Sequence, residues 1–221
     1  MKFNVQSDGF SIITGVIDAA VRENLLSVLG PIFGAGRRGL LGSPPIAAWA
    51  HSESMTQWVR PHLSGEPRPV RAIYFDKSPD SNWRVDWHQD LTLALGHQVE
   101  VPGFGLWSVK DGIPHVQPPV ELLEQMLTVR VHLDEADESN GALRVLPGTQ
   151  DLGRLTAVRI QELRGKIDEH LCAVSAGDAV LMRPLLLHAS NRSTSVGRRR
   201  VLHIEYAGFA LPPALKWHAA A

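Results

Sequence analysis

The sequence predicts a mainly β fold, a jelly roll or cupin-like barrel with helices packed outside it in the N-terminal part. Many short segments after Pro69 alternate apolar and polar residues with a period of two, the pattern of half-buried strands. Before Pro69, two stretches carry apolar residues at helical spacing. At 221 residues the chain can bury one full core, so we expect a single domain over residues 1–221.

The N-terminal part is expected to hold one short strand, two helical regions and a glycine-rich surface loop. The strand is expected at Phe10–Ile13, and an amphipathic helix at Asp18–Leu29 ends where a Gly-Pro pair follows. The loop covers Phe33–Gly42. Pro44–Leu63 forms the second helical region, which Pro61 should end because a proline removes a backbone donor.

The strands expected further along are short and separated by turn residues. They are Arg71–Lys77, Asn82–Leu91, Leu127–Leu133, Leu143–Leu146, Leu171–Val174, Ala179–Met182, Leu185–Ser190 and Arg198–Ala207. A helical turn is expected at Glu121–Gln125, and a loop with some helix at Asp151–Glu169. Gly96–Pro119 is rich in glycine and proline and reads as a long irregular connection. Such connections are often functional lids, so we expect an ordered lid here.

The most informative segment is Asn82–Leu91, in which His88 and Asp90 are two residues apart. Successive side chains of a strand point to opposite faces, so Arg84, Asp86, His88 and Asp90 are expected to share one face, where Arg84 and Asp86 can also simply pair with each other. An imidazole and a carboxylate placed in this way can take neighbouring positions on one metal ion. The segment therefore predicts two of the ligands of a metal site.

A third ligand is expected from a histidine on a late strand, and His188 is the best candidate. The competing histidines are His97, His115, His132 and His203. Two histidines and one carboxylate with open positions are typical of non-haem Fe(II) oxygenases. Zinc enzymes use similar donors, so the donor types alone leave the metal open.

The three consecutive arginines of the last strand are expected to point to different faces, because side chains alternate along a strand. Arg199 falls on the polar face that points into the barrel, whereas Arg198 and Arg200 are expected to be solvated. A guanidinium offers a planar fork of donors to a carboxylate. Arg199, with Ser190 two residues beyond the metal histidine, is therefore expected to hold the distal carboxylate of a dicarboxylic co-substrate.

Three motifs in this order resemble the phytanoyl-CoA dioxygenase family of Fe(II)/2-oxoglutarate oxygenases. They are His88-Gln89-Asp90, the run from Asn140-Gly141 to Pro147-Gly148-Thr149, and His188 with an arginine eleven residues later. The resemblance covers about Ala72 to Ala207 and implies a double-stranded β-helix. It also implies Fe(II) on His88, Asp90 and His188, with 2-oxoglutarate on Arg199 and Ser190.

The resemblance further implies a reaction that uses O₂ and releases succinate and CO₂. Related halogenases replace the carboxylate ligand by a small residue, so Asp90 favours hydroxylation or another oxidation over halogenation. Gln150 stands where the family often has histidine, and Arg130 where relatives can carry an aromatic residue beside the co-substrate.

The remaining site candidates concern the ends of the pocket. Arg71 and Thr128 can reach the inner end of the co-substrate. Contacts with the substrate or from the lid are expected of Arg130, Trp107, Lys110 and His115. A buried guanidinium needs an acidic partner. Arg130 is therefore expected to pair either with Glu205 or Asp86, or with a carboxylate or phosphate of a small polar substrate.

Composition argues against several other functions, such as binding nucleic acid or spanning a membrane. The formal net charge of −1 gives no electrostatic reason to expect nucleic acid, and no apolar run is long enough to span a membrane. With one cysteine, Cys172, and no signal-peptide core, a cytoplasmic protein is expected. Two alternatives stay open, a cupin-type enzyme with zinc or nickel and a catalytically silent binding module. Substrate identity and oligomeric state are not determined.

Overall fold

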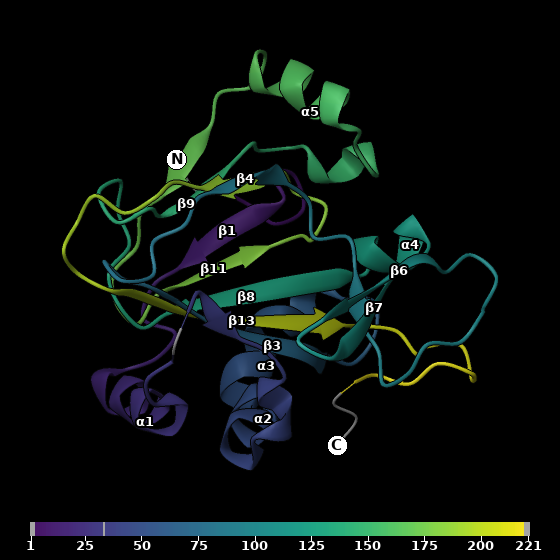
Figure 1. Cartoon of the computed structure of the whole chain (residues 1–221), viewed down its shortest axis with the longest axis horizontal. Coiled ribbons are helices and arrows are strands. Elements are labelled where there is room, and N and C mark those ends of the chain that lie inside the picture. The colour runs from purple at the N-terminus through teal and green to yellow at the C-terminus, as the bar shows by residue number, and fades with distance from the viewer. Residues whose placement is uncertain (1–2, 33, 219–221) are drawn as a thin grey trace.

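Two antiparallel sheets form the body of the molecule in the computed structural model, which describes residues 3–32 and 34–218 (Figure 1). The larger sheet has the strand order β1 (Phe10–Ile13), β11 (Ala179–Met182), β8 (Met126–His132), β13 (Arg199–Ala207), β3 (Arg68–Lys77) and β2 (Gly36–Arg37). The smaller sheet has the order β10 (His170–Cys172), β9 (Leu143–Val145), β12 (His188–Ser190) and β4 (Val85–His88). The predicted mainly β, jelly-roll architecture is confirmed.

Three N-terminal helices cover the outer face of the larger sheet, as Figure 1 shows. They are α1 (Ala19–Leu29), α2 (Pro44–His51) and α3 (Glu53–Val59). The Asp18 carboxylate accepts a hydrogen bond from the Val21 N–H at 2.8 Å, which satisfies a free donor at the start of α1. The predicted second helical region consists of two helices, α2 and α3, which are separated at Ser52. A 3₁₀ turn at Arg60–His62, which contains Pro61, follows them.

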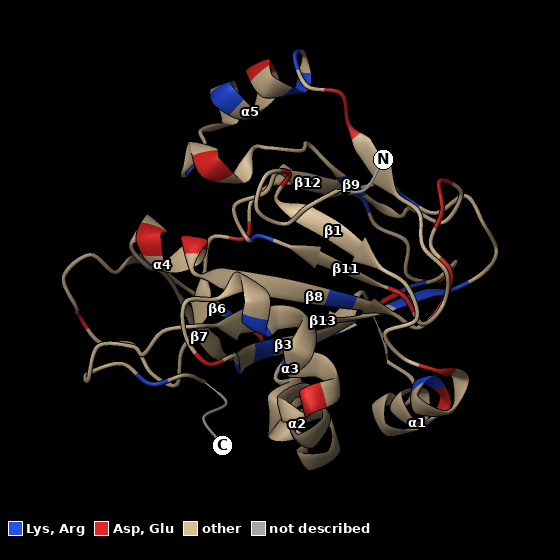
Figure 2. Cartoon of the chain, turned by 180° about the vertical axis from the view of Figure 1, so that it is seen from behind, with Lys and Arg blue, Asp and Glu red and all other residues tan. Residues whose placement is uncertain are grey.

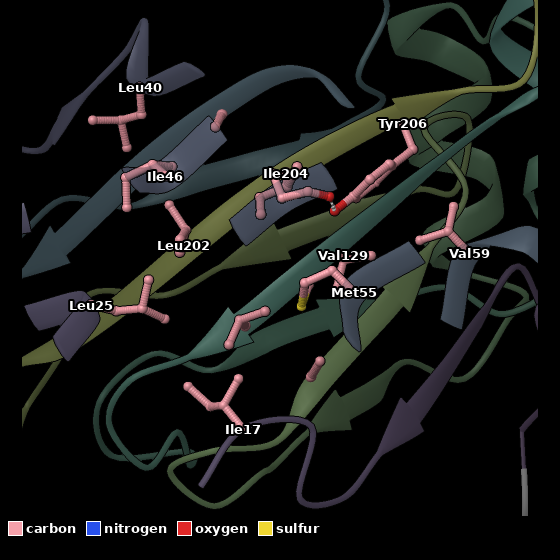
Figure 3. Close-up of a cluster of buried hydrophobic side chains, with 14 of the residues drawn as sticks. Ile17, Leu25, Leu40, Ile46, Met55, Val59, Val129, Leu202, Ile204 and Tyr206 are labelled. Carbon is pink, nitrogen blue, oxygen red and sulfur yellow. Dashed lines mark hydrogen bonds between the residues drawn. The ribbon is translucent and has the colours of Figure 1, made fainter. Parts of the chain in front are cut away.

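The apolar face of β13 packs against these helices and fixes which way the strand faces. Leu202, Ile204 and Tyr206 are fully buried in this cluster, together with the apolar face of β8 (Figure 3). The Tyr206 hydroxyl donates to the Ala50 carbonyl of α2 at 2.8 Å. Because side chains alternate along a strand, the other face of β13 must point between the two sheets. The predicted phases of the last strand and of β8 are confirmed.

The segment expected to be an irregular lid is instead largely a hairpin. Strands β6 (Gly105–Lys110) and β7 (Ile113–Gln117) pair with each other, and β7 also pairs with β5 (Leu93–Ala94). The turn is Asp111-Gly112, and both residues have left-handed φ angles of 52° and 77°. An Asp-Gly pair between alternating residues is a strong local signal for a two-residue hairpin turn, and the prediction overlooked it.

The remaining helices lie at the periphery. Helix α4 (Val120–Glu124) precedes β8, and α5 (Ala157–Arg164) lies over the smaller sheet with charges of both signs on its surface (Figures 1 and 2). The expected surface loop Phe33–Gly42 contains β2 and a 3₁₀ turn at Leu40–Gly42 whose leucines are buried; Phe33 itself lies outside the described residues. Within the described ranges, no helix combines the length and apolarity that crossing a bilayer requires.

Candidate active site

A cavity of about 640 Å³ lies between the two sheets and brings most of the predicted site residues together. Its walls come from β3, β8 and β13 of the larger sheet, from β4, β9 and β12 of the smaller sheet, and from the β6–β7 hairpin. The predicted residues that line it are Arg71, His88, Asp90, Lys110, Arg130, His188, Ser190 and Arg199. Thr128, Trp107 and His115 do not line it.

The three predicted metal ligands converge in the wall of this cavity. His88 Nε2 is 3.9 Å from Asp90 Oδ1, and His188 Nε2 is 3.7 Å from Asp90 Oδ2. The two imidazole rings are 4.2 Å apart between centroids. One possible metal-ligand atom from each of His88, Asp90 and His188 lies within 4.8 Å of the other two. Asp90 Oδ2 is buried without a hydrogen-bond partner among the described residues. A cation between these atoms would satisfy that oxygen.

Backbone contacts fix the tautomer of both histidines. His88 Nδ1 is 2.8 Å from the Asp86 carbonyl, and His188 Nδ1 is 2.8 Å from the Leu186 carbonyl. A carbonyl oxygen only accepts hydrogen bonds, so each Nδ1 carries the hydrogen and each Nε2 presents its lone pair. This arrangement orients metal-bound histidines in known sites. The residues present therefore fit a divalent metal ion.

The electrostatics keep these groups in the protonation states that metal binding requires. Burial alone would raise the pKa of Asp90, but the neighbouring imidazoles of His188, His203 and His88, together with Arg71, hold it well below its usual value. Burial and the neighbouring His88 lower the pKa of His188 to about 3. At neutral pH the triad is thus an ionised carboxylate facing a neutral, buried His188 imidazole.

The strand that carries His88 departs from the predicted phase. His188 lies opposite His88 and Ser190 lies opposite Val85, so three steps along β4 match two steps along β12. Such a bulge inverts the alternation, and Val85 lines the cavity while Arg84 and Asp86 form an exposed ion pair at 2.6 Å. The expectation that Arg84 and Asp86 face inward is wrong for this reason. Asp90 itself lies in the loop beyond β4.

Arg199 differs from its two neighbours as its phase predicts. Arg198 pairs with Asp76, and Arg200 pairs with Asp134 through two contacts of 2.7 Å. The Arg199 side chain is buried in the cavity wall, donates from Nε to the Asn140 carbonyl at 3.2 Å, and leaves Nη1 without a partner in the described part of the chain. Burial and the charge of Arg130 lower its pKa to about 9.

Lys77 is a further cation at this place that the sequence interpretation missed. It lies opposite Arg199 in the pairing of β3 with β13, is fully buried, and donates to Ser190 Oγ at 2.8 Å. Burial and the charges of Arg199 and Arg130 lower its pKa to about 7. Arg71, Ile73 and Phe75 line the cavity, so period-two alternation along β3 was a signal that could have found Lys77. Ser190 and Arg199 line the cavity, whereas Lys77 lies behind them and also donates to the Asn191 carbonyl. We call Lys77, Ser190 and Arg199 the Arg199 end of the cavity.

Arg130 does not have either of the acidic partners that were expected. Its Nη1 lies 2.9 Å from His203 Nδ1, and its guanidinium stacks over the Phe75 ring at 5.7 Å. Because an arginine only donates, His203 must carry its hydrogen on Nε2 and donate it to Glu205 at 3.2 Å. Glu205 also pairs with Arg71. The expected partner Asp86 is exposed and Glu205 is engaged by other groups.

Arg71 and Thr128 lie far from the Arg199 end. Both are opposite Glu205 in the larger sheet, six positions along β13 from Arg199, which is about 20 Å along a strand. They therefore cannot share a carboxylate with Arg199, whereas their expected contact with the inner end of the co-substrate stays a prediction. The Thr128 hydroxyl is buried without a partner among the described residues, behind the cavity wall.

The hairpin contributes one of its three predicted residues to the cavity. Lys110 lines it, and the next residue, Asp111, pairs with Arg38 at 2.6 Å. Trp107 packs against a hydrophobic cluster beneath the hairpin, and His115 is buried with Nδ1 on the Ile113 carbonyl at 2.9 Å. These two residues are thus placed for structural roles. We call Arg38, Lys110 and Asp111 the rim of the cavity.

Known proteins share this fold and this sequence pattern. Residues 42–201 match the model of the family described as phytanoyl-CoA dioxygenase (PhyH). An L-proline trans-4-hydroxylase from Streptomyces griseoviridis is 25% identical over 154 residues, which are 58% of this chain and 50% of that protein. The chain thus spans about half the length of this curated relative.

Solved structures with low sequence identity have the same fold. AviO1 from Streptomyces viridochromogenes Tue57 superimposes with a TM-score of 0.66 at 22% identity, over 95% of this chain and 94% of that one. EctD from S. alaskensis, crystallised with 2-oxoglutarate and 5-hydroxyectoine, gives 0.71 at 16% identity, over 92% and 73%. HygX from Streptomyces hygroscopicus, with nickel and 2-oxoglutarate bound, gives 0.63 at 19%, over 92% and 84%. With the family model covering most of its sequence, the chain belongs to the phytanoyl-CoA dioxygenase family, a family of Fe(II)- and 2-oxoglutarate-dependent oxygenases.

Proposed function

We propose that this protein is an Fe(II)- and 2-oxoglutarate-dependent dioxygenase that hydroxylates a small organic substrate. The observation that carries the proposal is a single cavity with two complementary sites. His88, Asp90 and His188 present lone pairs and a carboxylate to one point, and Arg199 presents an unpartnered donor in the same cavity. A chelating keto acid with a second carboxylate matches both sites.

The metal site has the donors of the two-histidine, one-carboxylate class, which leaves coordination positions open for other ligands. When bound there, Fe(II) supplies the activation of O₂ that is coupled to decarboxylation of 2-oxoglutarate, with succinate and CO₂ as products. The protein's part is to hold His88 and His188 by their Nδ1 atoms and to keep Asp90 ionised. A second cluster, Asp90 with His203 and Glu205, competes poorly because Glu205 already accepts from His203 and Arg71.

The Arg199 end suits the distal carboxylate of 2-oxoglutarate. Like charges directly opposite each other on paired strands are destabilising, and Lys77 lies opposite Arg199 with no acidic partner for either among the described residues. A carboxylate in the cavity beside Arg199 would offset this repulsion and satisfy Arg199 Nη1. Ser190, which donates to the Gly141 carbonyl at 3.0 Å, accepts from Lys77 and so holds its ammonium group in place.

Arg130 extends this cationic wall toward the metal ligands. His203 and Phe75 hold its guanidinium, and its Nε has no partner among the described residues. We assign Arg130 to the part of the co-substrate between the metal and Arg199, in place of a direct substrate contact. Its fixed donors would orient the co-substrate and exclude water from that part of the cavity.

The proposal also covers the localisation of the protein and its partners. Cys172 is free and buried, which agrees with a reducing, cytoplasmic compartment. The substrate is proposed to be a small molecule, because the site lies inside a cavity rather than on an open face. L-proline is a first probe, since the Streptomyces griseoviridis relative is named as its hydroxylase.

The test is anaerobic loading with Fe(II), followed by measurement of bound metal and of succinate formed from 2-oxoglutarate with O₂. Wild type should bind one metal ion per chain and turn over 2-oxoglutarate, whereas His88→Ala should do neither. Parallel loading with zinc and nickel tests the cupin-type alternative. A protein that binds metal and 2-oxoglutarate but forms no succinate with any substrate would instead be a binding module.

A further inference from the structure

The charged residues around the cavity are not balanced. Five cations and two carboxylates line it: Arg38, Arg71, Lys110, Arg130 and Arg199 against Asp90 and Asp111. Asp111 is engaged by Arg38, and Asp90 belongs to the metal site. Glu205, just behind the wall, is engaged by Arg71. Lys110, Arg130 and Arg199 therefore have no acidic partner within the described residues.

The cations lie at different places along the cavity. Arg71 is opposite Glu205, six positions along β13 from Arg199. Arg71 also borders a small cavity together with Arg38 and Ile113, and Ile113 is the strand partner of Lys110. On the proposed function, 2-oxoglutarate occupies the side of Arg130 and Arg199. The side of Arg71 and Lys110 is left for the substrate.

Arg71 and Lys110 both keep donors available on this side. Arg71 is largely buried; Nη2 is on Glu205 and Nη1 is 3.5 Å from Thr92 Oγ1, while Nε is buried without a partner in the described ranges. Lys110 precedes the hairpin turn, and the Arg38–Asp111 ion pair holds that turn at the rim. Lys110 is exposed, so its ammonium group is accessible to a ligand that enters the cavity. Partial burial and the charges of Arg71 and Arg38 lower its pKa.

We propose that Arg71 and Lys110 form an anion subsite for the substrate, so that the substrate of this enzyme carries a carboxylate or another small oxyanion. The anion lies between Arg71 in the cavity wall and Lys110 at the rim, and the part of the molecule to be oxidised points toward the metal ligands. This inference rests on the proposed function, because it takes the Arg199 end to be filled by 2-oxoglutarate. It makes Lys110 a specificity-determining residue on the hairpin.

The experiment uses nickel-loaded protein saturated with 2-oxoglutarate, so that the Arg199 end is occupied and no turnover occurs. Calorimetric titration at constant ionic strength compares benzoate, phenyl phosphate and neutral benzamide, and also L-proline with L-prolinamide. An acid should bind more tightly than its neutral counterpart, by about tenfold for one partly exposed charge contact. The carboxylate and phosphate arms identify which oxyanion the subsite takes.

Lys110→Gln should remove this preference, and Lys110→Arg should keep it. Lys166→Gln, an exposed lysine after α5 and outside the cavity lining, is the matched control and should bind like wild type. Three results would each overturn the subsite. Wild type could bind acids and amides with equal affinity, Lys110→Gln could keep the preference for acids, or no acid could bind at about 20 mM. The affinity of each variant for 2-oxoglutarate is measured first. Failure of wild type at that step refutes the proposed function and not the subsite alone.

Discussion

The Arg199 end and the rim of the cavity are both cationic, but they are built in opposite ways. Lys77 and Arg199 lie opposite each other on β3 and β13, Ser190 lies on β12 of the smaller sheet, and all three are at most 7% exposed. At the rim, the Arg38 and Asp111 side chains are 31% and 59% exposed, on a loop and a hairpin turn. The sheets thus fix the end assigned to the co-substrate, whereas the part assigned to the substrate combines Arg71, which is held in β3, with Lys110, which lies next to an exposed hairpin turn.

The two regions also differ in how their charges are satisfied. The rim carries its own ion pair, Arg38–Asp111. At the Arg199 end the acids Asp76 and Asp134 are engaged by the flanking arginines, and Lys77 and Arg199 are left facing each other. Substitutions at the Arg199 end should therefore have large effects on co-substrate binding, and those at the rim should have small ones.

The largest effect is expected at the metal site that lies between the two regions. Asp90→Ala should abolish iron retention and lower turnover by more than about 100-fold, since even loss of a group that only orients a metal ligand costs 10- to 100-fold. Metal analysis and succinate formation measure both. Asp86→Ala is the matched control, because Asp86 contacts His88 only through its backbone carbonyl and its side chain is exposed. Equal loss in both variants would contradict the bulge in β4.

Arg199→Ala should raise the dissociation constant of 2-oxoglutarate by about 30- to 1,000-fold, because a buried charge-assisted contact contributes roughly 2–4 kcal/mol. Arg198→Ala and Arg200→Ala should leave that constant nearly unchanged, since both side chains pair with acids outside the cavity lining. Anaerobic titration of the metal-loaded protein gives the three values. A larger effect from Arg198→Ala would mean that Arg198, and not Arg199, points into the cavity.

Lys77→Met should weaken 2-oxoglutarate binding by about tenfold and change its pH dependence. With a pKa of about 7, Lys77 is charged below neutral pH and loses its charge above it. The affinity of wild type should thus fall as pH rises from about 6 to 8. A wild-type affinity as flat across this range as that of Lys77→Met would show that Lys77 makes no charged contact with the co-substrate.

The same group predicts the pH dependence of stability. Between pH 7 and 10.5 the unfolded chain holds the Lys77 proton and the folded protein without co-substrate does not. Stability should therefore rise with pH in this window, and the rise should be smaller in Lys77→Met. Urea unfolding at several pH values measures the difference. Parallel profiles for the two proteins would argue that Lys77 titrates normally.

The smallest effect is expected from Arg38→Gln at the rim. An exposed ion pair contributes about 0–1 kcal/mol, so the free energy of unfolding should change little and the 2-oxoglutarate affinity should stay within about twofold. Hydrogen exchange of the β6–β7 hairpin should nevertheless increase, because the turn loses its tie to the 34–42 loop. Weakened 2-oxoglutarate binding in this variant would show that rim and Arg199 end are coupled.

The sequence by itself determined the features that depend on local alternation and on motif order. The apolar residues Leu202, Ile204 and Tyr206 determined which face of β13 packs against the helices. The opposite face points into the cavity, and this singled out Arg199 among three arginines. The order of the His88, Asp90 and His188 motifs likewise indicated which groups would meet. The hairpin was also predictable, since Asp111-Gly112 is a local turn signal that went unused.

Only the tertiary structure decided which groups become partners across the sheets. The bulge in β4 depends on its pairing with β12, so alternation within β4 alone placed Arg84 and Asp86 on the wrong face. Strand register brings together residues that are far apart in the chain. It places Lys77 opposite Arg199, and it pairs Glu205 with Arg71, while Glu205 also accepts from His203, so that Arg130 has no acidic partner among the described residues. A side chain's own strand sets its direction, but the neighbouring strands set its partner, and electrostatic function depends on the partner.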